Sequence, residues 1–342
     1  MDSLTQIVLG AACGELILGK KIGNKALLFG AIGGTIPDLD VLLGALFYSN
    51  SIDQLAFHRG IMHSLVFAII AAMVLGFVVF EAYNTKKRKH STTLKDWMLL
   101  FLFSIGTHPI LDSFTPYGTQ LFAPFSDVRI AFNNISVIDP FYTLPFLICM
   151  IVVLFLKRNN PMRLTWAKAG IYISSVYMVC TLFAKIYIDS VFKNSYKKAG
   201  IETLRFRTQP TALNAILWYG IAETKEDYVL SYYSLFDSSS TANKMIHVSK
   251  NHELLYMNAP DLKKMAWFSD AFFMLEPIKN SNHIKYNDLR YVLPTEKDSI
   301  NAMMTFTIKK KGDRFETTPP EYDNLENFSV LLNRLFTRLK GI

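Results

Sequence analysis

Three short motifs in an otherwise apolar part of the chain contain residue types that bind metals. Ionisable groups cost roughly 2.5–3.5 kcal/mol each inside a membrane segment, so where they are retained they are functional candidates by default. The six candidates are Asp38 and Asp40 in PDLD, His58 and His63 in HRGIMHS, and His108 and Asp112 in THPILD.

Imidazole and carboxylate groups together indicate a divalent metal, and we expect zinc, with iron or manganese as alternatives. His108 and Asp112 are spaced so that on a helix they lie about 40° apart on one face. The three cysteines have no metal-binding spacing, which argues against a closed structural zinc site. Six candidates exceed the ligands that one catalytic zinc needs, so we expect either two ions, or one ion whose ligands are supported by the remaining groups.

A bound divalent ion makes water nucleophilic at neutral pH, and one of the carboxylates can accept the proton. The chemistry predicted is therefore hydrolysis. The catalytic candidates are Asp40, His58 and Asp112, and the candidates for binding an anionic substrate are Arg59 and Arg129. For Arg129 the alternative, which we favour, is a structural pairing with Asp139.

Each of these residues also has a structural explanation when taken alone. A histidine near a helix end is commonly a hydrogen-bonded polar residue, and Pro37–Asp38 can cap a broken helix. Arg59 can anchor the chain at lipid headgroups. Only the convergence of all six side chains at one depth of a membrane domain favours a metal site.

The elements that must position these motifs are apolar helices. Hydrophobic residues make up 51% of the 342 residues and charged residues only 19%, which is too apolar for an ordinary soluble enzyme. About 20 mostly apolar residues cross a membrane. The sequence therefore predicts a helical membrane domain over residues 1–190 with five or six hydrophobic segments: 26–47, 62–83, 97–112, 138–156, 168–189 and, as a span, a re-entrant segment or an interfacial helix, 4–19.

Basic residues gather in three short loops, 20–25, 86–90 and 157–163. These loops fall on one side if every segment crosses, and the positive-inside rule makes that side cytoplasmic. The metal-binding motifs then face outward, as does the rest of the chain after about residue 190. The net charge of +8 is explained by this orientation, so we expect membrane lipid as a partner and no nucleic acid. The oligomeric state is not indicated.

Residues 191–342 have the pattern of a small α+β domain. The stretches AILWYGIAET and DYVLSYYSLF predict two strands joined near Lys225. The segments 253–275 and 322–341 favour helices, and MMTFTIKKK favours another strand. The fold class expected is thus an α-helical membrane protein followed by a small α+β extracytoplasmic domain.

Two small-xxx-small patterns, Gly10–Gly14 and Gly30–Gly34, occur in the first apolar segments. We interpret them as sites of close helix packing. Neither follows a strand in the way that a nucleotide-binding fingerprint requires.

The N-terminal MDSLTQIVLGAACGE, together with PDLD, HRGIMHS and THPILDSFTPYG in this order, resembles the YdjM-type family of inner-membrane metal-dependent hydrolases, which is also described as LexA-binding. The resemblance covers roughly residues 1–160. It implies a bacterial cytoplasmic-membrane protein with a hydrolase-like metal site. The ligand set that it implies is the six residues named above. The arrangement is also distantly similar to zinc-dependent phospholipase C.

One position departs from the family pattern. Members often carry a histidine near the N-terminus, where this chain has Gln6, a poor zinc ligand. This favours either a smaller site or a single ion with Gln6 as a hydrogen-bonding neighbour over a full multinuclear site. The resulting hypothesis is a membrane-embedded hydrolase of a phosphoester or lipid-linked substrate. The alternatives are an ion or solute transporter that uses the same cluster and a non-catalytic membrane scaffold.

Overall fold

The structure is a computed structural model that describes residues 1–242, 244–255, 257–279, 281–293, 301–312, 314–318 and 328–341. The chain forms two compact units. The first contains Met1–Leu43 and Phe57–Leu182. The second contains Gly44–Ala56 and Phe183–Ile342, so that a segment near residue 50 joins the C-terminal unit.

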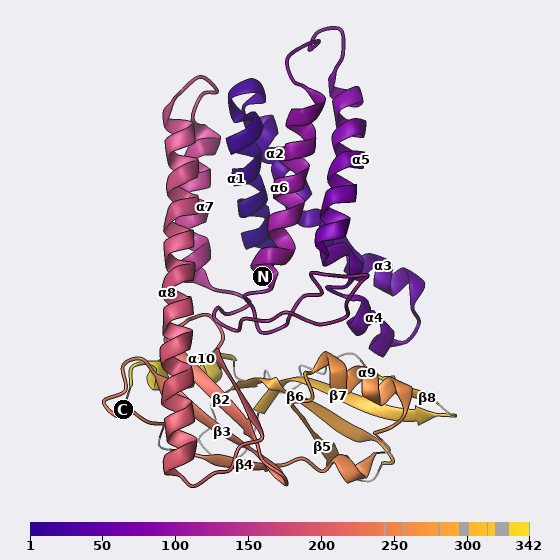
Figure 1. Ribbon diagram of the computed structural model, residues 1–342, viewed down its shortest axis with the longest axis vertical. Coiled ribbons are helices and arrows are strands. Elements are labelled where there is room, and N and C mark those ends of the chain that lie inside the picture. Colours follow the sequence, from indigo (N-terminus) through magenta and orange to yellow (C-terminus); the bar gives the residue numbers. More distant parts are fainter. Residues whose placement is uncertain are drawn as a thin grey trace. The chain divides into compact units, whose positions relative to one another are not determined.

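The first unit is a bundle of helices that run side by side (Figure 1). The second helix is broken at Pro37, which cannot donate a backbone hydrogen bond, and the chain passes through a 3₁₀ turn before helix α3 begins at Asp40. The elements are α1 (Ser3–Ile22), α2 (Asn24–Thr35), η1 (Ile36–Leu39), α3 (Asp40–Phe47), η2 (Ile61–His63), α5 (Leu65–Tyr83), α6 (Leu94–Asp112), α7 (Pro140–Phe155) and α8 (Met162–Lys198), the last of which continues into the second unit.

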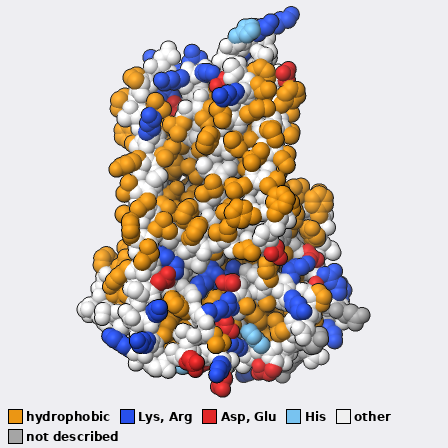
Figure 2. All heavy atoms as spheres, in the orientation of Figure 1, with side chains coloured by type: hydrophobic (Ala, Val, Ile, Leu, Met, Phe, Trp, Pro, Cys, Tyr) orange, Lys and Arg blue, Asp and Glu red, His pale blue; other side chains and the backbone are white. Residues whose placement is uncertain are grey.

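Three helical segments of the described chain are long and apolar enough to cross a membrane: Asn24–Phe47, Leu65–Tyr83 and Met162–Lys198. The apolar helix Pro140–Phe155 is shorter. Figure 2 shows hydrophobic side chains over the visible face of the bundle, as expected of a surface in contact with lipid. The predicted class, a helical membrane protein with a small C-terminal domain, is therefore confirmed at this level.

Helices α1 and α2 approach closely through the two predicted glycine patterns. A Cβ atom at Gly10 would overlap the carbonyl oxygen of Gly30, and one at Gly14 would overlap the carbonyl oxygen of Ala26. The segment whose placement the sequence left open, 4–19, thus lies within α1, which packs against α2 and α6 in the bundle.

The three basic loops lie at one end of the bundle (Figure 1). Lys21 at the end of α1 pairs with Asp96 at the start of α6, with 2.5 Å between Nζ and Oδ2. The guanidinium of Arg158 donates to the carbonyl of Lys21 at 3.0 Å. The loops that follow α1, α5 and α7 are therefore neighbours.

The second unit contains two four-stranded antiparallel sheets, each with its strands in chain order. Ile221 and Leu230 of the first sheet pack with Met274 and Leu289 of the second in one buried cluster. The elements are β1 (Arg205–Pro210), β2 (Leu217–Glu223), β3 (Asp227–Ser234), β4 (Ile246–Ser249), η3 (His252–Leu254), α9 (Pro260–Phe268), β5 (Phe273–Pro277), β6 (Ile284–Leu293), β7 (Asn301–Lys311), β8 (Arg314–Thr317) and α10 (Phe328–Leu339), with α4 (Ser51–Phe57) largely in this unit.

The hairpin predicted near Lys225 is present as the antiparallel pair β2–β3, and the strand predicted at MMTFTIKKK lies within β7. The helix predicted over 253–275 is wrong at its C-terminal end, which forms β5. A short apolar run such as FFML is compatible with a helix or with a strand, and here pairing with β6 makes it a strand. The helix predicted over 322–341 is found as α10 from Phe328, and its first residues lie outside the described chain.

Candidate metal centre

The break at Pro37 and two helix ends bring the predicted motifs together. Asp38 lies in the 3₁₀ turn between α2 and α3. His63 ends the short helix η2, after which Ser64 caps α5 by accepting from the backbone of Phe67 at 3.0 Å. His108 and Asp112 occupy the last turn of α6, so segments distant in sequence meet at one end of the bundle.

Asp38, His63 and His108 each offer a ligand atom within 4.8 Å of the other two. Oδ1 of Asp38 lies 3.5 Å from Nε2 of His63 and 3.4 Å from Nε2 of His108. Oδ2 of Asp112 lies 3.5 and 3.6 Å from the same two nitrogens. Four ligands at about 2.1 Å from one tetrahedral zinc are separated by about 3.4 Å. Asp38, His63 and His108 therefore fit a single ion, and Asp112 is a fourth candidate by its distance to the two imidazoles.

The other nitrogen of each imidazole lies close to an oxygen atom. Nδ1 of His108 lies 2.6 Å from the carbonyl oxygen of Gly34, and Nδ1 of His63 lies 3.0 Å from Oδ2 of Asp40. Both rings are fully buried, and neither Nε2 atom has a hydrogen-bond partner among the described residues. Buried polar atoms are normally paired, so two such atoms that face two carboxylates indicate a place for a cation.

Asp40 stands behind this group instead of within it. Besides facing His63, its carboxylate accepts from the backbone N–H of Arg59 at 2.9 Å and pairs with Nδ1 of His58 at 2.8 Å. Burial lowers the pKa of His58 below its ordinary value, although the Asp40 carboxylate opposes this shift. His58 lies next to the ring of His63, with 5.6 Å between centroids.

The second oxygen of Asp112 accepts hydrogen bonds from two N-terminal residues. Oδ1 accepts from the side-chain amide of Gln6 at 2.9 Å and from the α-amino group of Met1. The same amide lies 3.2 Å from the carbonyl oxygen of His108. Gln6 is buried, and its side-chain amide hydrogen-bonds to a candidate ligand.

Two arginines and a tyrosine lie at the edge of the group. Nε of Arg59 is 3.1 Å from Oδ2 of Asp112, and its Nη1 donates to Thr115 at 3.0 Å. Arg129 donates from Nη2 to the carbonyl oxygen of His58 at 2.5 Å. The guanidinium groups of both arginines face the ring of Tyr117, at 4.7 and 5.2 Å from its centroid.

Sequence reasoning missed Tyr117 and Thr115. The motif TPYG indicates a turn, and nothing in its spacing shows that the ring meets two arginines that lie far away in the chain. The sequence offered one indication of their role: both residues closely follow Asp112, in the motif that contains two candidate ligands.

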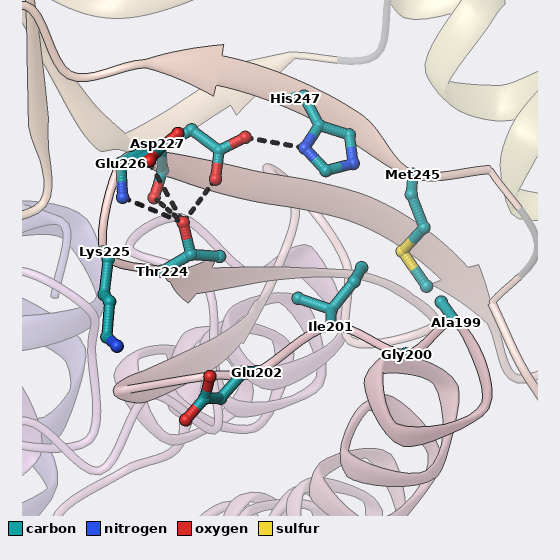
Figure 3. A pocket seen from close by; sticks show the side chains of 10 residues that line it. All are labelled: Ala199, Gly200, Ile201, Glu202, Thr224, Lys225, Glu226, Asp227, Met245 and His247. Atoms are coloured by element: carbon teal, nitrogen blue, oxygen red, sulfur yellow. Dashed lines mark hydrogen bonds and ion pairs between the residues drawn. The ribbon is translucent and has the colours of Figure 1, made fainter.

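A cavity of about 520 Å³ in the second unit offers other polar residues, among them Glu202, Asp227 and His247 (Figure 3). His247 pairs with Asp227 at 2.6 Å. Figure 3 shows Glu202 on the other side of the cavity, with its carboxylate directed away from His247. Because its ionisable groups do not converge, this cavity is a weaker candidate than the cluster in the bundle.

Comparison with known proteins identifies a family for the helical part of the chain. Residues 1–190 match the sequence model of a family described as YdjM inner membrane protein. The chain is 22% identical to the uncharacterized protein YfhP of Bacillus subtilis (strain 168) over 302 residues. This aligned region covers 85% of this chain and 87% of that protein.

A second relative is the inner membrane protein YbcI of Escherichia coli (strain K12). It is 31% identical over 131 residues, which span 35% of this chain and 70% of that protein. No solved structure matches the chain. Because the family match covers more than half of the residues and includes every motif of the metal centre, the chain belongs to the YdjM inner membrane protein family.

Proposed function

We propose that this protein is a membrane-embedded, metal-dependent hydrolase that acts on a phosphoester of a lipid or lipid-linked compound. The observation that supports the proposal most strongly is the group of Asp38, His63 and His108, whose ligand atoms lie within 4.8 Å of one another. Oδ2 of Asp112 lies 3.5 and 3.6 Å from the same two imidazoles. A group with no thiolate and with ionisable neighbours is typical of a catalytic centre.

Asp38, His63, His108 and Asp112 would hold one divalent ion, for which zinc is our first choice. When bound, such an ion polarises a phosphoryl oxygen and lowers the pKa of water. Two histidines and two carboxylates leave the site with no net charge once the ion is present, which reduces the cost of burying it.

His58 is the residue placed to accept a proton. Because the Asp40 carboxylate can only accept, Nδ1 of His58 must donate to it, which leaves Nε2 of the neutral ring as an acceptor. Asp40 then stabilises the imidazolium formed when Nε2 takes the proton from water. The side chain of His58 is 24% exposed, whereas that of Asp40 is 1% exposed, so His58 is the one that substrate water reaches.

Arg59 and Arg129 would bind the negative charge of the substrate. A guanidinium presents several N–H donors in a planar fork that suits phosphate. Contacts with Tyr117 limit the conformations of both side chains, so less entropy is lost when an anion binds.

The basic loops support the proposed side of the membrane. They lie at the opposite end of the bundle from the start of α3 (Figure 1), next to which Asp38 lies, and the positive-inside rule favours the cytoplasm for the basic end. The proposed location of the site is therefore the outer face of the bacterial cytoplasmic membrane, with the C-terminal domain also outside.

Activity tests the proposal directly. Detergent-purified protein is incubated with bis-p-nitrophenyl phosphate and with phosphatidic acid or phosphatidylcholine, with zinc or with EDTA. We expect metal-dependent turnover of at least one substrate, lost in His63→Ala and strongly reduced in His58→Gln, and retained in the control Glu81→Gln, whose carboxylate is exposed at the far end of α5. Turnover that persists in His63→Ala contradicts the mechanism.

A transporter is the second candidate, because the helix break between α2 and α3 places Asp38 at an unwound segment, as in ion-coupled transporters. The position of the cluster at the bundle end, away from its middle, favours the hydrolase. Metal flux into proteoliposomes without hydrolysis of any phosphoester identifies the transporter.

A further inference from the structure

The loop between α6 and α7 exposes a series of apolar side chains at the same end of the bundle as the metal cluster. In residues 119–132 the exposed fractions are 52% for Phe122, 85% for Phe125, 62% for Val128 and 49% for Phe132. Exposed apolar patches of this kind mark surfaces that bind a partner or a membrane. A turn that only connects two helices needs no such residues.

The loop is held in a defined conformation. Thr119 and Ile130 exchange backbone hydrogen bonds of 3.0 and 2.9 Å, which close the loop at its base. The backbone of Gln120 donates to the carbonyl oxygen of Arg59 at 3.1 Å. The exposed aromatic residues are therefore presented by a fixed scaffold that is attached to the edge of the metal centre.

The apolar surface of this loop continues that of a candidate membrane span. The backbone N–H of Leu65, the first residue of α5, donates to the carbonyl oxygen of Leu121 at 3.0 Å. One turn further along α5, Ile69 and Ile70 are about half exposed on its outer surface. Because α5 is a candidate membrane span, lipid that covers its surface would also cover Phe122 next to Leu121.

We infer that residues 122–132 insert into the membrane at headgroup depth, with lipid as the partner of Phe122, Phe125 and Val128. Arg129 of the same loop donates to the backbone carbonyl of His58 beside the metal cluster, so one loop presents apolar side chains and a guanidinium together. A lipid phosphate would reach the centre along this loop. That last step rests on the proposed function, whereas insertion of the loop does not.

Spin-label accessibility tests the insertion without using activity. Cys180 is the exposed cysteine and is replaced by alanine, while Cys13 and Cys149 are buried. Single cysteines are introduced as Phe125→Cys and Val128→Cys in full-length protein reconstituted in phosphatidylglycerol–phosphatidylethanolamine vesicles. The references are Ile70→Cys on the surface of α5 and Lys86→Cys in a basic loop.

For both loop labels we expect the ratio of oxygen to nickel-chelate accessibility to exceed that of the Lys86 label several-fold and to fall below that of the Ile70 label. A ratio equal to that of the Lys86 label overturns the inference, because the loop is then in water. Labels shielded from both reagents overturn it as well, because protein then covers the loop. Metal content measured on the same samples shows whether the proposed centre is intact, so the two proposals fail separately.

Discussion

Asp40 lies directly behind His63, with its Oδ2 3.0 Å from Nδ1 of the imidazole, while Nε2 of the same ring faces Asp38 and Asp112. A carboxylate behind a ligand histidine fixes the ring and raises its basicity. Asp38 and Asp40, only two residues apart in the sequence, thus lie on opposite sides of the same imidazole ring.

Replacing Asp40 by asparagine should weaken metal binding by about 10- to 100-fold. The carboxylate meets two imidazoles and one backbone N–H, and an amide offers a single acceptor oxygen to all three. Competition with a chromophoric chelator measures the dissociation constant. Unchanged affinity in Asp40→Asn, with the exposed Glu81→Gln as the control, contradicts the orienting role.

The bundle should depend on the buried pair Glu15–Arg163. Arg163 donates to both carboxylate oxygens, at 2.9 and 2.6 Å, and also to the carbonyl oxygens of Val153 and Leu156. Arg163→Ala leaves a buried carboxylate unpaired, which costs about 3–5 kcal/mol. Thermal unfolding in detergent should show a strongly lowered midpoint, with Lys168→Ala unchanged. If Arg163→Ala unfolds at the wild-type midpoint, the pair does not stabilise the bundle.

The close approach of α1 and α2 predicts a contrast between two glycines. Gly30→Ala should destabilise the protein by about 1–3 kcal/mol, because its Cβ atom would overlap the carbonyl oxygen of Gly10 and push the helices apart. Gly106→Ala should be tolerated, since its nearest neighbour, Cβ of Ala68, is 3.8 Å away. Equal effects of the two substitutions on the unfolding midpoint count against this packing.

Membrane orientation is tested by labelling intact cells with a membrane-impermeant maleimide in the Cys180→Ala background. The proposed orientation predicts that Lys86→Cys reacts only after the membrane is permeabilised. Lys311→Cys in the C-terminal unit, where the side chain is exposed, should react at once. The reverse pattern places the metal centre on the cytoplasmic side.

Much of the bundle could be predicted from the sequence, because apolar runs and Pro37 act locally. The length of α8 could not, since its last turns, up to Lys198, are polar and lie outside any hydropathy signal. The replacement of a predicted helix by β5 has the same origin: pairing with β6 is a long-range contact.

The site shows the same division between local and long-range information. The residue types and helix ends identified the ligand candidates. Whether Asp38 or Asp40 faces His63 and His108 depends on a single 3₁₀ turn. The roles of Tyr117 and Thr115 depend on contacts with Arg59. Neither follows from composition or spacing.

The most direct test of the central claim is the metal content of detergent-purified protein by mass spectrometry, with wild type beside His63→Ala, Asp112→Ala and the control His90→Ala. The account predicts about one zinc, iron or manganese ion per chain in wild type and His90→Ala, and loss of that ion in the other two variants. Metal-free wild type that cannot be reloaded with any of the three metals contradicts it.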